Sequence, residues 1–238
     1  MRNGMGMFRD FGKAMDRRAV IRFSGCLGSA FALCLLPISG VRGGTGTEKE
    51  ALPERVDRGL VLAACGGGEI RPFRTAEAEA GAAVVIFVTT DCPIANRYAP
   101  EIERIRRDYA ERGVSLTLIH VDAKLSDEEA LAHAREFGLG AGLAVDREHL
   151  AVQAAGARVT PEAVVVDPVG RIRYRGRIDD QFADYGARRV QPLRRDLREA
   201  IEDLLAGREV AVSETEAIGC HIPTLASGEN IAPAPPER

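Results

Sequence analysis

Short apolar runs alternate along residues 57–207 with stretches in which apolar residues recur at helical spacing. Residues 83–89 form a continuous apolar run, which is typical of a strand buried on both faces. After this run, Ile102, Ile105 and Tyr109 lie on one face of a predicted helix. The other elements that we expect are a hairpin around residues 65–68, strands at 114–121, 143–145, 163–166 and 171–178, a helix opening at the capping box Ser126–Glu129, a helical turn at 150–155, and a last helix that contains Leu193 and ends at Gly207.

Strands and helices alternate first, and a hairpin and a helix then close the pattern. This order predicts one α/β sandwich with a central mixed β-sheet flanked by helices. Residues 44–56 are polar and read as a linker. Residues 208–238 show no period and end in a Pro-rich run, so we expect a flexible C-terminal tail.

The N-terminal segment, residues 1–43, differs in kind from the rest. It begins with a basic stretch, continues with an apolar run of small residues from position 27 to 39, and ends near glycines. This order is that of a secretory signal, and Arg17-Arg18 followed by Val20-Ile21 fits the twin-arginine type. We therefore expect an exported protein, periplasmic after cleavage or held at the membrane by residues 19–40.

Charge and composition restrict the partners. Residues 1–43 carry a net charge of +5 and the whole chain one of −3, so the remaining residues carry −8. An acidic body offers no basic stripe for a phosphate backbone, and we expect no nucleic acid partner. Beyond residue 43 the chain keeps three cysteines, which leaves one over if two of them pair.

Cys92 is the candidate reactive thiol. It follows the apolar run 83–89 and precedes Pro93, a residue favoured at the first position of a helix. Cys92 is then the N-cap, where unpaired backbone N–H groups lower a thiol pKa and favour the nucleophilic thiolate. Arg97 would add to this effect and Asp91 would oppose it. The alternative is an inert core cysteine.

Two prolines carry a resemblance to a known superfamily. Pro100 lies eight residues after Cys92, and Thr160-Pro161 precedes the strand at 163–166. The spacing resembles that of the thioredoxin superfamily, whose active-site helix starts at its cysteine and contains a proline. The resemblance implies that Pro161 is cis, faces Cys92 and shapes the substrate groove. Alternatively, the helix begins only at Pro100, and Pro161 is an ordinary trans proline.

Over residues 57–207 the chain is most similar to the redoxin branch of that superfamily, which includes peroxiredoxin-like and exported thioredoxin-like proteins. The run Thr90-Asp91-Cys92-Pro93 resembles a subset with a Thr-Asp-Cys-Pro motif. Three expected residues are missing. Ala95 replaces the second cysteine of Cys-x-x-Cys, Asn96 replaces that of Cys-x-x-x-Cys, and Val85 replaces a peroxiredoxin proline, whereas Thr89 matches the peroxiredoxin threonine.

The resemblance implies a thiol-based oxidoreductase without a bound cofactor. The substrate would be a protein disulfide, a thiol or a peroxide, and Cys92 would attack the disulfide or the peroxide. An unidentified reductant would restore Cys92, and Thr89 would hydrogen-bond the attacked group. Cys220, 128 positions later, would be the resolving thiol if the tail brings it to Cys92; alternatively it has no role.

A non-catalytic module that binds a protein or Cu(I) through Cys92, Cys220 and His221 is the competing interpretation. Cys65 is expected on another face, and His120, His133 and His149 stand singly.

Overall fold

The computed structural model describes residues 53–75, 81–184 and 186–225. The predicted export segment, including the possible anchor at 19–40, lies outside them. Within the described residues, no helix is long and apolar enough to span a membrane.

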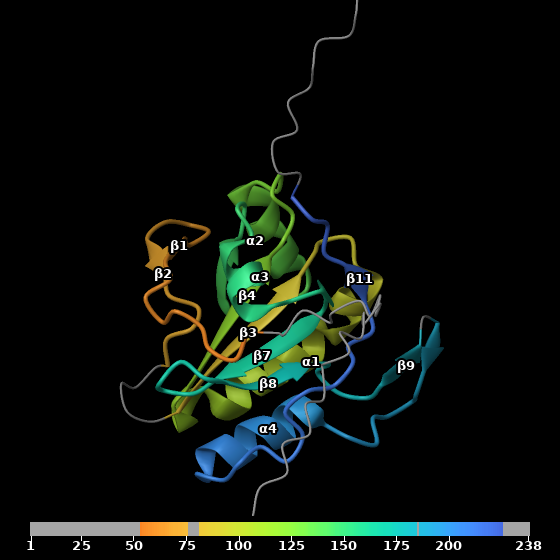
Figure 1. Ribbon diagram of the computed structural model, residues 1–238. Helices are drawn as coiled ribbons and strands as arrows, with labels where there is room; N and C mark the ends of the chain where they lie inside the picture. The colour runs from red at the N-terminus through yellow and green to blue at the C-terminus, as the bar shows by residue number, and fades with distance from the viewer. Residues whose placement is uncertain (1–52, 76–80, 185, 226–238) are drawn as a thin grey trace, which may run out of the picture. The chain divides into compact units, whose positions relative to one another are not determined.

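A five-stranded mixed sheet forms the centre of the unit (Figure 1). Its strand order is β5-β4-β3-β7-β8. Strand β4 runs parallel to its neighbours β3 and β5, and strand β7 runs antiparallel to its neighbours β3 and β8. The bounds of these strands are β3 Ala82–Val88, β4 Val114–His120, β5 Gly142–Val145, β7 Glu162–Val166 and β8 Ile172–Gly176. All seven residues of β3 are buried, as the apolar run predicts for a central strand.

Helices cover both faces of this sheet. One face packs against α1 (Pro93–Tyr109), α2 (Asp127–Glu136) and α4 (Asp196–Leu205), and the other packs against α3 (Leu150–Ala155) and the segment around Phe73. The predicted α/β sandwich of thioredoxin-like type is confirmed. Ser126 caps α2 through the predicted capping box. Leu193 departs from the prediction, because α4 begins only at Asp196 and leaves Leu193 80% exposed.

Short elements complete the unit. The predicted hairpin around residues 65–68 is present as β1 (Leu62–Ala63) and β2 (Glu69–Ile70). A 3₁₀ turn, η1 (Ala110–Arg112), follows α1, and β9 (Phe182–Asp184) pairs with β10 (Ala187–Arg188). The last pair joins β6 (Val159–Thr160) to β11 (Cys220–His221).

Both predicted irregular ends contact the fold where the structure describes them. Ile172 N–H donates to Glu54 O, and Val56 N–H donates to Gly170 O, each at 2.9 Å, so residues 53–56 are part of the unit and not of a linker. Residues 208–225 run back along β8 and pair with β6 through β11, which corrects the predicted tail for this stretch. Part of this contact is made by backbone groups, which leave no hydrophobic period in the sequence. Residues 226–238 lie outside the described part.

Candidate active site

Cys92 is held at the start of α1, directly after the central strand β3. It has extended backbone geometry, Pro93 occupies the first helical position, and Ala95 N–H donates to Cys92 Sγ at 3.5 Å. Pro100 lies inside the same helix, so the alternative that the helix begins at Pro100 is wrong. The Cys92 side chain is 0% exposed. The sequence therefore places this thiol among the free N–H groups of a helix start, as predicted.

The loop around Pro161 lies against this thiol. The Thr160–Pro161 peptide bond is cis, as the resemblance implies. The Cys92 thiol donates to Thr160 O across 3.0 Å, and the hydroxyl oxygens of Thr89 and Thr160 are 3.3 Å apart. The structure thus brings Cys92, Pro161 and Thr89 together. Thr160, whose carbonyl and hydroxyl both contact the site, carries no sequence signal beyond its place before Pro161.

Cys220 reaches the same place from the C-terminal segment. Strand β11 pairs antiparallel with β6, and Cys220 lies directly opposite Thr160 in the register. The Thr160 hydroxyl lies 3.5 Å from Cys220 O. Since Thr160 also contacts Cys92, the cysteines are neighbours, and both are free thiols. Among the described residues, the third cysteine, Cys65, does not lie next to Cys92.

The surroundings shift the pKa values of the two thiols in opposite directions. Burial raises the pKa of Cys92, but hydrogen bonding from Ala95 N–H, from the Cys220 side chain and N–H, and from Ile94 N–H outweighs it, so the pKa is lowered. Thr160 O accepts only from the protonated thiol and opposes this effect. Burial and the neighbouring Cys92 raise the pKa of Cys220 to about 11. Of the two thiols, Cys92 is therefore the one that loses its proton first.

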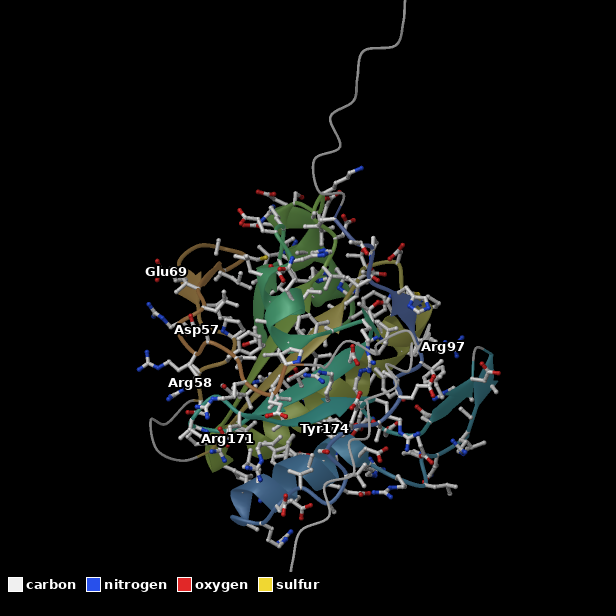
Figure 2. All side chains as sticks on the ribbon, viewed as in Figure 1. Asp57, Arg58, Glu69, Arg97, Arg171 and Tyr174 are labelled. Carbon is white, nitrogen blue, oxygen red and sulfur yellow. The ribbon has the colours of Figure 1, made fainter. Side chains whose placement is uncertain are left out.

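Two other residues from the sequence analysis do not join the site. Cys65 lies beside α2, and burial together with Asp127 raises the pKa of its thiol to about 11. Arg97 is exposed on α1 and points to solvent (Figure 2), so the helix start and Cys220 lower the pKa of Cys92 without it.

A buried polar cluster anchors the loop that carries Cys92. Asn96 donates through Nδ2 to Thr90 O at 2.9 Å, and its Oδ1 lies 2.8 Å from His133 Nε2. His133 therefore donates from Nε2. His120 packs against it, with ring centroids 5.0 Å apart. Burial lowers the pKa of His120 to about 4, so this ring is neutral at physiological pH. No local signal in the sequence indicates this cluster, because its members come from β4, α1 and α2.

The described residues do not assemble the three-ligand metal set of the competing interpretation. Among residues 53–75, 81–184 and 186–225, no group of three or more His, Cys, Asp or Glu side chains could hold a metal ion. His221 follows Cys220 in a strand, where successive side chains point to opposite faces. It lines an outer groove with Arg158 and Glu214, whereas Cys220 faces Cys92.

Comparisons with known proteins agree with this fold. Residues 62–175 match the model of the AhpC/TSA family. A structure of an uncharacterized conserved protein from Geobacillus kaustophilus aligns with 25% identity over 74% of this chain and 94% of that chain, with a TM-score of 0.62. A hypothetical protein from Sinorhizobium meliloti 1021 aligns with 24% identity over 74% of this chain and 96% of that chain, also with a TM-score of 0.62. No curated protein matches the chain.

The match to the AhpC/TSA model covers just under half of the chain and supports a redoxin-type domain of thioredoxin-like fold over those residues. The family match includes Cys92, Thr89 and Pro161, and it ends before Cys220. Cys220, which lies beside Cys92, therefore comes from a part of this chain outside the matched residues.

Proposed function

We propose that this protein is an exported thiol oxidoreductase in which Cys92 attacks a disulfide or a peroxide and Cys220 resolves the product. One observation carries the proposal. Strand β11 sets Cys220 opposite Thr160, whose carbonyl oxygen is 3.0 Å from Cys92 Sγ. A second thiol beside the helix-start thiol can resolve the oxidised Cys92, a role that Ala95 cannot fill.

With a peroxide, the Cys92 thiolate attacks one oxygen of the O–O bond. An S–O bond forms, the O–O bond breaks, and the released alkoxide or hydroxide takes up a proton, which leaves a sulfenic acid on Cys92. With a disulfide, Cys92 forms a mixed disulfide and releases one thiolate. In both cases the substrate accepts two electrons from the protein once the second step is complete.

In the second step, the Cys220 thiolate attacks the Cys92 sulfur. The Cys92–Cys220 bond forms, and hydroxide, protonated to water, or the second substrate thiolate leaves. The charge on Cys92 contributes to the raised pKa of Cys220. Oxidation of Cys92 removes that charge, so the first step lowers the pKa of Cys220 and prepares it for the second. An external thiol reductant then returns two electrons.

The neighbouring residues orient these steps. Pro161 follows Thr160, whose carbonyl oxygen lies 3.0 Å from Cys92 Sγ, and as a proline it offers no N–H donor of its own. The Thr89 hydroxyl, held near that of Thr160, is placed to hydrogen-bond the attacked group. Export rests on the basic, apolar and small-residue order of residues 1–43, and it would put the pair in a compartment where disulfides persist.

The proposal is tested by reacting the reduced protein with hydrogen peroxide and with glutathione disulfide, and counting the free thiols that remain. We expect the loss of two thiols per chain, a transient sulfenic acid in Cys220→Ser, and no reaction in Cys92→Ser. The control is Cys65→Ser, which should behave like the unsubstituted protein. If Cys92→Ser consumes both oxidants at the unsubstituted rate, Cys92 is not the nucleophile and a binding module becomes the better interpretation.

A further inference from the structure

The C-terminal segment closes the edge of the site. Strand β11 pairs with β6, and Ile222 N–H donates to Arg158 O at 3.0 Å, so the backbone next to the cis peptide already has a strand beside it. Cys92 beneath this strand is 0% exposed. We call residues 213–222 the strap, since they run from β8 to β6 over this edge.

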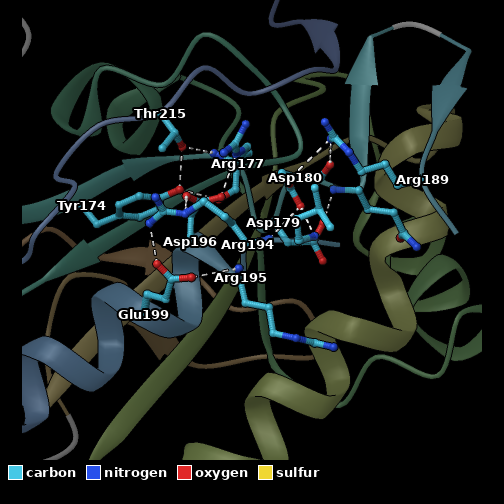
Figure 3. Close-up of polar contacts among 12 residues, drawn as sticks. Tyr174, Arg177, Asp179, Asp180, Arg189, Arg194, Arg195, Asp196, Glu199 and Thr215 are labelled. Carbon is cyan, nitrogen blue, oxygen red and sulfur yellow. Dashed lines mark hydrogen bonds and ion pairs between the residues drawn. The ribbon is translucent and has the colours of Figure 1, made fainter. Parts of the chain in front are cut away.

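The strap is fixed at its other end to β8. Arg175 N–H donates to Ser213 O at 2.9 Å, and Thr215 N–H donates to Arg175 O at 3.0 Å. The Thr215 hydroxyl is 2.7 Å from the Tyr174 hydroxyl and accepts from Arg177 N–H at 3.1 Å. Figure 3 shows the contacts that join Thr215 to both Tyr174 and Arg177. The strap therefore has a backbone ladder at each end.

Polypeptides and small molecules face this edge differently. Without β11, the backbone of β6 next to Cys92 would be a free strand edge, and an extended polypeptide could bind there by adding a strand. In this protein β11 already holds that place. A hydroperoxide or a small disulfide needs no such backbone pairing and requires only local movement of the strap.

We propose that the strap occupies the polypeptide-binding edge above Cys92, so that the closed protein oxidises its thiol pair with small O–O or S–S compounds and excludes polypeptide disulfides. This inference rests on the proposed function and specifies its substrate class. Opening the strap would then convert the site to one that accepts polypeptides.

Gly219 allows the strap to be displaced while both cysteines are kept in the chain, although Cys220 moves with β11. A Cβ added to Gly219 would lie 2.1 Å from Thr160 O and 2.6 Å from Thr160 C, and both are backbone atoms. Gly219→Ala must therefore push β11 away from β6. Thr215→Val is a second, gentler variant, which removes the hydroxyl between Tyr174 and Arg177. Glu216→Ala is the matched control, an exposed position in the same strap.

The experiment measures oxidation of Cys92 by hydrogen peroxide, by glutathione disulfide and by insulin as a polypeptide disulfide. In the unsubstituted protein and in Glu216→Ala, we expect oxidation by at least one of the two small compounds and little by insulin. Because the rate with a polypeptide follows the fraction of open molecules, Gly219→Ala should raise the insulin rate about tenfold or more, and Thr215→Val should raise it in the same direction.

Two outcomes distinguish failure of the strap proposal from failure of the proposed thiol chemistry. If insulin oxidises the unsubstituted protein as fast as it oxidises both strap variants, the strap does not select substrates, while the thiol chemistry of Cys92 stands. If none of the three compounds oxidises Cys92 in any variant, the proposed function itself is wrong. Alkylation of Cys92 by a small and by a polymer-linked maleimide gives an independent readout of strap opening.

Discussion

Replacement of Cys220 tests the electrostatic coupling of the two thiols. Cys220→Ala removes a donor to the Cys92 thiolate, whereas Cys220→Ser keeps an O–H donor of similar size in the same place. Hydrogen bonds to charged groups contribute about 1.5–3 kcal/mol, and a thiol, as a weak donor, belongs at the lower end. Since one pKa unit corresponds to about 1.4 kcal/mol, loss of this bond should raise the pKa of Cys92 by about one unit.

A second effect acts in the opposite direction. Burial is the largest single influence on Cys92 and raises its pKa, so the space left by alanine admits water and lowers the pKa. The Ser variant preserves this burial more closely. The comparison of Ala with Ser therefore isolates the hydrogen bond, and we expect the pKa of Cys92 to be about one unit higher in Cys220→Ala than in Cys220→Ser.

The assay is the pH dependence of Cys92 alkylation by iodoacetamide, followed by mass spectrometry of the Cys92 peptide. Following that peptide alone separates the signal from Cys65, whose pKa is about 11. Equal pKa values in the two variants, or a lower value in Cys220→Ala, would show that Cys220 does not hydrogen-bond the Cys92 thiolate.

Three further predictions concern the loop, the fold and the resolving step. Asn96→Ala breaks the link between His133 and Thr90 O, so alkylation of Cys92 should slow at fixed pH; an unchanged rate would contradict the anchoring role. Asp146→Ala should lower the free energy of unfolding in denaturant by about 2 kcal/mol or more, because three backbone N–H groups of α3 lose a buried acceptor, and a loss below about 0.5 kcal/mol would refute this. Closure of the disulfide after peroxide treatment, measured by stopped flow, should speed up as pH rises, because Cys220 must lose its proton; a rate that falls with pH would be incompatible with attack by its thiolate.

The sequence predicted the parts of the site that have local signals. Cys92 before Pro93 gives the N-cap, and Pro100 is accommodated inside α1 as the resemblance to thioredoxin folds implied. The setting of Thr160-Pro161 gave the cis bond. Each of these signals depends on a proline or a cap, which restricts the backbone within a few residues.

The rest depends on contacts between distant segments. Strand β11 is two residues long and binds through backbone groups, so residues 208–225 carry no period that distinguishes them from a flexible tail. His120 and His133 meet only because β4 and α2 pack together, and a single sequence does not show such a pairing. For the same reason, the meeting of Cys92 and Cys220 stayed an open alternative until the register of β11 was known.

Peptide mapping of the oxidised full-length protein shows whether Cys92 and Cys220 form the redox pair. After brief treatment with hydrogen peroxide or glutathione disulfide, we expect a Cys92–Cys220 cross-linked peptide that is lost on reduction and absent from Cys220→Ser. Free Cys220 beside a Cys92 that is oxidised to sulfinic acid, or a cross-link that joins Cys92 to Cys65, would contradict it.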